Sequence, residues 1–245
     1  MAEQTAGEVA PAQSWSWLRP FIPKRAQPFL RGLRKWMQPE RRELEEPYRS
    51  VFTYTQASLT RQRNLVSIGQ TLDREKIPGA IVECGVLDGG TAALMAWATD
   101  ASRQVHLFDA WEGLPETTAE DGAEARKWTG EVVGSPTRVL AIMDKLGVKR
   151  ERLSIHRGWF NETFPVAGEF AVALLHVDCD FYDPTKLCLE KWYPLLSPGG
   201  FMQFDDYESF QGCRMAVDQF LADHPALALN TVGTHGSAYV IRKPL

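Results

Sequence analysis

Two pairs of aspartates follow two apolar runs in the second half of the chain. Asp178 and Asp180 end the run AVALLHV, and Asp205 and Asp206 end the run GGFMQF. Apolar runs of this kind are typical of buried strands in a parallel sheet, and ligands bind at the carboxyl ends of such strands. Four carboxylates at one edge repel one another unless a cation binds them or one takes up a proton. The pattern therefore predicts a metal site with oxygen ligands and a spare carboxylate that can act as a base.

The same aspartates also have a structural interpretation. Asp178 and Asp180 point to opposite sides if the chain there is extended, which leaves one of them free to cap the next helix. Asp205 and Asp206 together can form a loop and the N-cap of a helix. Because two such pairs end successive strands, we favour the functional interpretation.

Other polar residues near these strands are assigned to the structure. Asp183 is expected to cap a helix that begins at Pro184, and His176 is interpreted as a core histidine with satisfied hydrogen bonds. His156 is given no catalytic role. His235 lies in a glycine-rich turn beside the crevice, where a substrate contact stays open.

A glycine-containing turn, ECGVLDGGT at 83–91, lies between a predicted strand and a predicted helix. Its spacing is not the G-x-G-x-x-G of dinucleotide-binding turns, and it lacks the Lys-Ser/Thr of a phosphate loop. Glu83 repels a pyrophosphate but suits a cationic ligand or one with an amine, and Asp109 at the next strand end can accept bonds from ribose hydroxyls. These features together fit S-adenosylmethionine. The alternative is a nucleotide-free turn that the glycines only tighten.

Alternating strand and helix patterns position these residues. Strands are expected at 80–85, 104–109, 152–156, 171–178, 199–205, 226–232 and 237–242, and helices at 54–76, 91–99, 135–146, 185–195 and 210–222. Ser135 and Pro136 are expected at the N-cap and first helical position of the third helix. The alternation predicts an α/β fold, a doubly wound and mostly parallel seven-stranded sheet that closes with an antiparallel C-terminal hairpin.

The first 50 residues are expected to form an arm, and residues 51–245 the catalytic domain. Residues 1–42 carry eight Lys and Arg against three Glu, a net charge of +5, and the total of −4 leaves −9 for the rest. Residues 30–37 have the apolar spacing of one short amphipathic helix. We expect the arm to pack on the body or on a second subunit, so that the chain is a homo-oligomer. Membrane-surface contact or a mobile segment is the alternative.

Composition restricts the class of protein. Hydrophobic residues make up 44% of the 245, which suits one α/β domain, and the net charge of −4 gives no general case for nucleic acid. The four cysteines form no CxxC pair and are interpreted as buried thiols. No apolar run reaches the ~18 residues of a membrane span, and no secretory signal is recognised, so a cytoplasmic location is expected.

Five blocks, in this order along the chain, resemble the macrocin O-methyltransferase family. They are VECGVxxGG at 82–90, FDAWEGLP at 108–115, GWFNETFP at 158–165, HVDCDFY at 176–182 and GGFMQFDDY at 199–207. The resemblance covers roughly residues 50–242. The sequence departs from the family in Asp-Ala-Trp at 109–111, in Cys179 and in Asp-Pro-Thr at 183–185.

The resemblance implies a class I methyltransferase sheet, S-adenosylmethionine as methyl donor, Mg²⁺ and a hydroxyl of a sugar or sugar-bearing natural product as acceptor. It implies that Asp178, Asp205 and Asp206 hold the metal and that Asp180 is the general base. The residues that it places around the donor are Glu83, Gly85, Val86, Gly89, Gly90, Thr91, Asp109, Trp111, Gly158, Trp159 and Asp178.

Three rival functions are weighed against this one. Methylation of a catechol or polyphenol uses the same metal geometry, because any vicinal diol can chelate the ion. A donor-binding subunit without activity is disfavoured by the four aspartates, and a nicotinamide oxidoreductase by the glycine spacing and Glu83. Trp111, Trp128 and Trp159 lie on loops that can line a sugar or aryl pocket, although ordinary packing explains Trp128 equally well.

Overall fold

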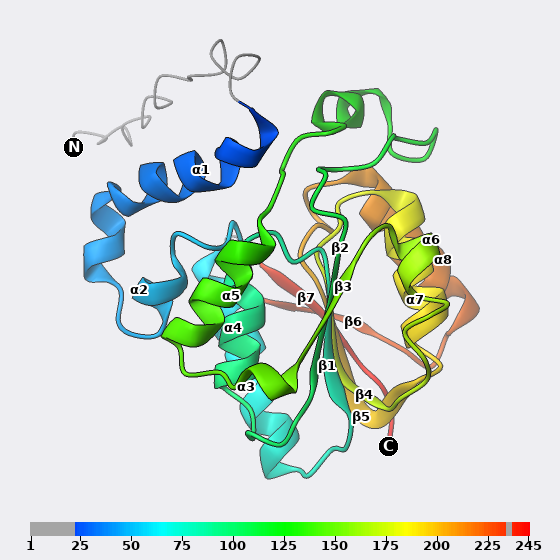
Figure 1. Ribbon diagram of the computed structural model, residues 1–245. Helices are drawn as coiled ribbons and strands as arrows, with labels where there is room; N and C mark the ends of the chain where they lie inside the picture. The colour runs from blue at the N-terminus through cyan, green and yellow to red at the C-terminus, as the bar shows by residue number, and fades with distance from the viewer. Residues whose placement is uncertain (1–22, 234–236) are drawn as a thin grey trace, which may run out of the picture.

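A seven-stranded sheet forms the centre of the computed structural model, which describes residues 23–233 and 237–245 (Figure 1). The strand order is β3-β2-β1-β4-β5-β7-β6; the first five strands are parallel, and β7 is antiparallel to both of its neighbours. The predicted doubly wound sheet with a C-terminal antiparallel hairpin is confirmed. The strands are β1 Ala80–Cys84, β2 Val105–Asp109, β3 Leu153–Arg157, β4 Val172–Val177, β5 Leu196–Phe204, β6 Leu229–Val232 and β7 Ala238–Arg242.

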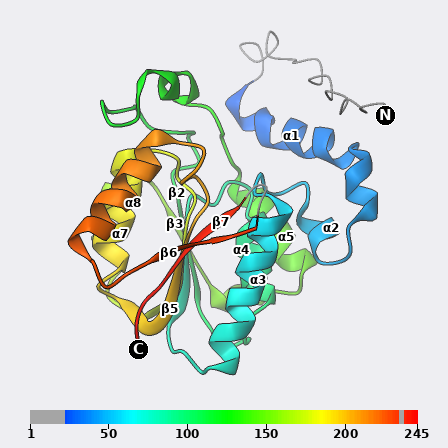
Figure 2. The same ribbon diagram turned by 180° about the vertical axis from the view of Figure 1, so that it is seen from behind.

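Helices cover both faces of the sheet (Figures 1 and 2). One face carries α3 Leu59–Arg74, α4 Gly90–Trp97 and α5 Pro136–Lys145, and the other carries α6 Phe160–Thr163, α7 Tyr182–Trp192 and α8 Gln211–Asp223. The short helix α2 Tyr48–Val51 packs against α4 and α5, and α1 Gln27–Trp36 lies outside this layer. The 3-10 helices are η2 Lys24–Ala26, η3 Pro39–Glu43, η4 Ala123–Trp128 and η5 Arg150–Arg152.

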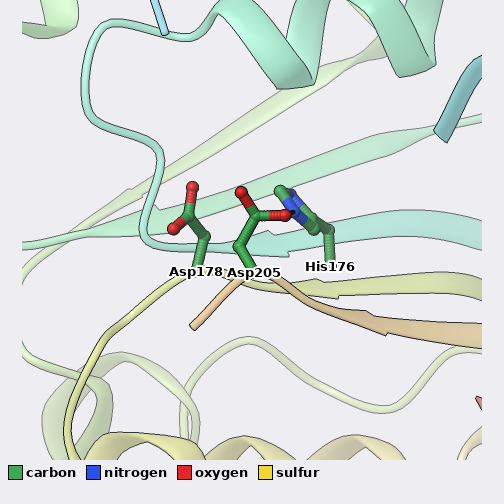
Figure 3. A group of neighbouring side chains, drawn as sticks. All are labelled: His176, Asp178 and Asp205. Atoms are coloured by element: carbon green, nitrogen blue, oxygen red, sulfur yellow. Dashed lines mark hydrogen bonds and ion pairs between the residues drawn. The ribbon is translucent and has the colours of Figure 1, made fainter. Parts of the chain in front are cut away.

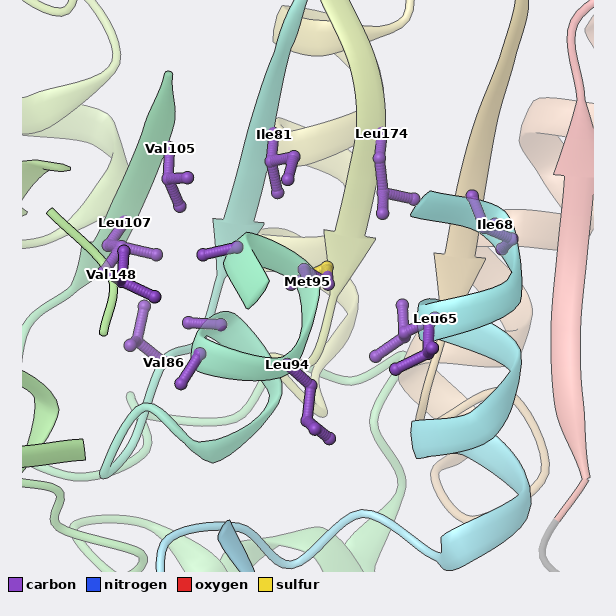
Figure 4. Close-up of a cluster of buried hydrophobic side chains, with 14 of the residues drawn as sticks. Leu65, Ile68, Ile81, Val86, Leu94, Met95, Val105, Leu107, Val148 and Leu174 are labelled. Atoms are coloured by element: carbon purple, nitrogen blue, oxygen red, sulfur yellow. The ribbon is translucent and has the colours of Figure 1, made fainter. Parts of the chain in front are cut away.

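The apolar runs of the sequence form two buried clusters, one on each face of the sheet. In the cluster drawn in Figure 4, side chains of α3 and α4, such as Leu65 and Leu94, meet Ile81 of β1. The second cluster lies beneath α7 and α8 and includes Trp192 and Phe204. Every residue of β4 is buried because helices cover both of its faces. This packing holds the carboxyl ends of the central strands in fixed positions.

Helix α7 begins earlier than predicted, and the predicted cap is wrong. The helix starts at Tyr182, so Asp183 lies in its first turn and cannot be its N-cap. The N–H of Tyr182 donates instead to Oδ1 of Asp121, 2.7 Å away, from the long segment after β2. Ser135 and Pro136 occupy the predicted N-cap and first position of α5, although Ser135 makes no side-chain cap hydrogen bond.

The predicted amphipathic helix of the arm is present as α1, but its apolar side faces outward. Phe29, Leu30, Leu33, Trp36 and Met37 are all exposed, and the buried residues of the helix are Pro28 and Gly32. The tryptophans at positions 15 and 17 lie outside the described residues, as does His235.

The remaining expectations from composition agree with the structure where it describes them. All four cysteines are buried free thiols. Across residues 23–233 and 237–245, no helix has the length and apolar character needed to cross a bilayer.

Candidate active site

A cavity of about 440 Å³ opens at the carboxyl ends of the parallel strands. Its lining comes from the turn after β1, the ends of β2 and β3, and the residues that follow β4 and β5. All four aspartates predicted to share one edge line this cavity: Asp178, Asp180, Asp205 and Asp206. The sheet therefore brings together the two clusters that the sequence separates by 25 residues or more.

The backbone turns sharply between the two aspartates that follow β4. Asp180 has a φ of +62°, in the left-handed region that non-glycine residues seldom adopt. The expectation that Asp178 and Asp180 point to opposite sides applies only to an extended chain, and the chain is not extended here. The N–H of Asp180 donates to Oδ2 of Asp206 at 3.0 Å. This bond joins the two clusters directly and aims both carboxylates of the first pair into one cavity.

The crowded carboxylates perturb one another's ionisation, as the sequence predicted. Burial, with the charges of Asp205 and Asp206, raises the pKa of Asp178 well above its ordinary value. Burial and the charge of Asp206 do the same to the pKa of Asp180. Burial and Asp205 raise the pKa of Asp206 to about 6. Only a cation or protons relieve such a cluster, so the donor set of four carboxylates fits a hard oxygen-seeking metal.

Asp205 differs from the other three because positive groups surround it. Burial opposes its charge, but the hydrogen bond and charge of His176, with Arg61, lower the pKa of Asp205 below its ordinary value. The guanidinium Nη1 of Arg61 lies 3.7 Å from Asp205 Oδ2, and Gln203 Nε2 donates to Oδ1 at 3.2 Å. Arg61 comes from the first turn of α3 and lines the cavity. Sequence reasoning missed it, because α3 looks like an ordinary polar helix.

His176 is a buried bridge between two acids, which confirms its interpretation as a core histidine. Its Nδ1 lies 2.8 Å from Oε1 of Glu83, and its Nε2 lies 3.1 Å from Oδ1 of Asp205. Figure 3 shows the carboxylates of Asp178 and Asp205 side by side, with the imidazole beyond Asp205. Burial opposes a charge on His176, but hydrogen bonds to both acids raise its pKa well above 6.5. Both ring nitrogens are thus engaged by carboxylates.

The turn after β1 approaches the backbone of Asp178 at the acidic edge. Gly85 has a φ of +88°, and a Cβ at this position would lie 1.8 Å from the carbonyl oxygen of Asp178. Only glycine fits there. Asp109 fixes the same turn, because its Oδ2 accepts the N–H groups of Val86 and Leu87, both at 2.8 Å. Its Oδ1 accepts the N–H of Trp111 at 2.6 Å, and burial raises its pKa.

The residues predicted around the donor divide into two groups. Seven of them line the cavity: Gly85, Val86, Thr91, Asp109, Gly158, Trp159 and Asp178. Glu83, Gly89, Gly90 and Trp111 are not among its lining residues. Glu83 is 0% exposed, and Trp111 lies behind the turn, where its Nε1 donates to Leu87 O at 2.8 Å. Trp128, for which the sequence left packing and a pocket equally open, lines the cavity and contacts Phe210 edge-on.

The segment between β2 and α5 borders the cavity and is fastened by one buried acid. Asp121 accepts the Tyr182 N–H through Oδ1 and the Thr118 N–H, at 2.8 Å, through Oδ2. A Cβ on Gly212 would lie 1.9 Å from that Oδ1, so α8 must have glycine at this contact. The sequence showed only a long polar connection here, because the partner of Asp121 is 61 residues away.

Comparison with known proteins gives the same assignment. Residues 5–239 match the macrocin-O-methyltransferase (TylF) family. An 8-demethyl-8-(2,3-dimethoxy-alpha-L-rhamnosyl)-tetracenomycin-C 4'-O-methyltransferase of Streptomyces olivaceus is 32% identical over 68% of this chain and 67% of its own length. Mycinamicin III 3''-O-methyltransferase of Micromonospora griseorubida is 31% identical over 76% of each chain.

A solved structure agrees in fold and sequence. The O-methyltransferase NovP superposes with a TM-score of 0.71 at 27% identity, covering 78% of this chain and 83% of that one. The chain thus combines this strand order with a glycine-containing turn and an acidic edge. Its sequence matches one family over most of its length. The chain belongs to the macrocin O-methyltransferase family and is an S-adenosylmethionine-dependent O-methyltransferase.

Proposed function

We propose that this enzyme methylates a hydroxyl of a sugar carried by a natural product, with Mg²⁺ at the acidic edge. The names of the two relatives, which act on a rhamnosyl tetracenomycin and on mycinamicin III, support the acceptor class. The observation that carries the proposal is that four carboxylates and the glycine turn line one cavity.

Asp178, Asp205 and Asp206 would hold the ion. Mg²⁺ bound there supplies positive charge that makes a nearby acceptor hydroxyl more acidic. Arg61 and His176 keep Asp205 ionised and fixed, since each approaches a different oxygen of that carboxylate. No side-chain hydrogen bond to Asp178 is found among the described residues, and burial with the charges of Asp205 and Asp206 raises its pKa more than the charge of His176 lowers it.

Asp180 is the general base in this proposal. Its backbone is held by the hydrogen bond to Asp206, so its carboxylate is positioned without using its own oxygens. A base works best when its pKa lies near the working pH, and burial raises the pKa of Asp180 in that direction. The proton of the acceptor hydroxyl would pass to this carboxylate as the oxygen bonds to the methyl carbon and the methyl–sulfur bond of the donor breaks, which leaves S-adenosylhomocysteine.

The turn at 85–87 and Asp109 would place the donor. Their backbone and carboxylate border the cavity, and Oδ1 of Asp109 keeps a lone pair after accepting the N–H of Trp111, whereas Oδ2 already accepts two N–H groups. Glu83 lies buried outside the cavity lining, and its Oε2 has no hydrogen-bond partner among the described residues, so Glu83 would favour the donor's amine through its negative charge. Trp159 and Trp128 border the same space and suit the faces of an adenine or a sugar.

The proposal also covers the compartment and the oligomeric state of the enzyme. Four buried free thiols support a reducing compartment such as the cytoplasm. The outward apolar face of α1 supports self-association of the chain as a homo-oligomer.

The proposal is tested by transfer of a labelled methyl group from S-adenosylmethionine to a panel of acceptors. The panel contains glycosylated polyketides, the same aglycones without sugar, and a simple catechol. We expect label on the glycosylated compounds alone, lost with a chelator and restored by Mg²⁺. Label on the catechol and not on any sugar would overturn the acceptor class, and full turnover in chelator would overturn the metal.

A further inference from the structure

A buried carboxylate that the proposed chemistry does not use lies in the turn after β1. Asp88 directly follows the cavity-lining residues Val86 and Leu87, yet its side chain is 0% exposed and does not line the cavity. Its Oδ2 lies 2.8 Å from Nη2 of Arg31 and 3.2 Å from Nε of Arg138. Its Oδ1 has no hydrogen-bond partner among the described residues. A buried acid of this kind depends on its cationic partners.

One of those partners belongs to the arm. Arg31 lies in α1, 57 residues before Asp88, and its Nη2 also donates to the carbonyl of Val133 at 3.0 Å. One turn later, Lys35 donates to the carbonyl of Thr55, a residue that lines the cavity. The basic side of α1 therefore contacts two segments at the edge of the active site.

These polar contacts replace the apolar burial that usually attaches an amphipathic helix. Leu33 is 55% exposed and Trp36 is 60% exposed, so the apolar side of α1 contributes little to its attachment. Gly32 lets the helix approach closely, since a Cβ there would lie 2.6 Å from Nη2 of Arg138. Arg31, Lys35 and this close approach therefore contribute to the attachment of α1 to the body, together with a cation–π contact between Phe29 and Arg138.

The turn that Asp88 anchors is also held from the cavity side and from the segment after β2. Asp109 accepts the N–H groups of Val86 and Leu87. The carbonyl of Leu87 accepts from Trp111 Nε1 at 2.8 Å and from Ser135 N at 3.1 Å. The ion pairs of Asp88 hold the turn from the opposite, outer side.

We propose that Arg31 is a positioning residue for methyl-donor binding: through Asp88, attachment of α1 holds the 85–89 turn in its donor-binding shape. The inference rests on the proposed role of this turn in binding the donor. It links the arm to donor binding in a cavity that no described residue of α1 lines. Coupling through a packed network of this size changes affinity by amounts that calorimetry resolves.

Binding of S-adenosylhomocysteine to the full-length protein, measured by isothermal calorimetry, tests the inference. Arg31→Met should raise the Kd about tenfold, or about 1.4 kcal/mol. Arg34→Met removes an exposed charge from the same helix and should leave the Kd within about twofold. In an Asp88→Asn background, Arg31→Met should add no further loss, because the pair is already broken. Melting temperatures recorded in parallel separate stability from affinity.

A second variant keeps the test decisive if Arg31→Met folds poorly. Gly32→Ala preserves the helix and both charged partners of the pair, but its Cβ must displace the Arg138 guanidinium. It should also weaken binding. Wild-type affinity in either folded variant, whatever its melting temperature, would overturn the inference. Failure of the wild-type protein to bind S-adenosylhomocysteine would instead overturn the assignment of the turn to the donor.

Discussion

Among the four aspartates at the active-site edge, Asp180 alone combines a left-handed backbone with a carboxylate outside the proposed ligand set. Asp180→Asn keeps the shape and the N–H bond to Asp206 but removes the base. We expect kcat to fall by about 10² to 10⁴. Binding of S-adenosylhomocysteine, measured by calorimetry, should stay unchanged.

The matched control is Asp223→Asn, an exposed acid at the end of α8. It should leave kcat within about twofold. If Asp180→Asn turned over like this control at saturating Mg²⁺, Asp180 would not be the base.

His176 stabilises the fold by pairing two buried acids at once. His176→Phe keeps the ring but leaves Glu83 and Asp205 without their shared partner. Breaking a buried ionic contact costs about 3–5 kcal/mol of unfolding free energy. Urea unfolding measures the loss.

His156→Phe provides the comparison. This half-buried ring stacks on Phe108 with centroids 4.1 Å apart, so an aromatic replacement keeps the contact. The loss should be about 1 kcal/mol or less. Equal losses in the two histidine variants would mean that the bridge contributes no more than packing.

At the scale of elements, Asp121 joins the 111–134 segment to the N-terminus of α7. Asp121→Ala removes the acceptor for the Tyr182 N–H and frees the segment from Gly212. Because the segment borders the outer part of the cavity, we expect the KM for the acceptor to rise about tenfold. The Kd for S-adenosylhomocysteine should change little, and limited proteolysis should cut the segment faster.

Glu124→Ala is the control within the same segment. Glu124 is exposed and pairs only with Lys127 at 2.9 Å among the described residues. Its loss should leave both the KM and the cleavage rate near wild type. A similar rise in KM in both variants would show that the contact between Asp121 and the Tyr182 N–H has no special role.

Sequence reasoning succeeded where the signal is local. Buried apolar runs and glycine-marked turns predicted a mostly parallel sheet, and the acid-terminated strands predicted which carboxylates meet at its edge. It failed where partners are distant along the chain. Asp121 caps α7 in place of Asp183, and Arg61 reaches Asp205 from another helix. Neither pairing leaves a periodic trace, since a single side chain makes each contact.

The orientation of α1 shows a different limit. Its apolar spacing predicted the helix, and hydrophobic periodicity alone would have placed that face inward. The ion pair between Arg31 and buried Asp88 accompanies the reversed orientation, because the basic side of the helix, and not its apolar side, must face the body to make this contact.

For the molecule as a whole, the acidic edge makes stability depend on pH and metal together. Burial and Asp205 raise the pKa of Asp206 from 3.8 to about 6, so between these values the folded protein binds more protons than the unfolded one. Without metal, the contribution of Asp206 to the free energy of unfolding therefore rises as pH falls through about 6 and decreases as pH rises.

Mg²⁺ reverses this dependence, since it binds ionised carboxylates. The rise in melting temperature caused by Mg²⁺ over chelator should be larger near about pH 8 than near about pH 5. In Asp206→Asn, both the metal-free pH dependence and the Mg²⁺ effect should shrink. Equal Mg²⁺ effects at the two pH values, measured by thermal unfolding, would contradict a metal held by these carboxylates.

The contact between Gly85 and Asp178 has a consequence for how such an enzyme can be altered. A Cβ at position 85 would lie 1.8 Å from the carbonyl oxygen of Asp178, so the turn after β1 and the backbone of the first proposed metal ligand leave no room for a side chain between them. In the proposed function, the spacing between the donor-binding turn and this metal ligand is therefore set by backbone packing. Redesign toward a new acceptor should leave this edge untouched and exchange the 111–134 segment, with the contact between Asp121 and the Tyr182 N–H retained.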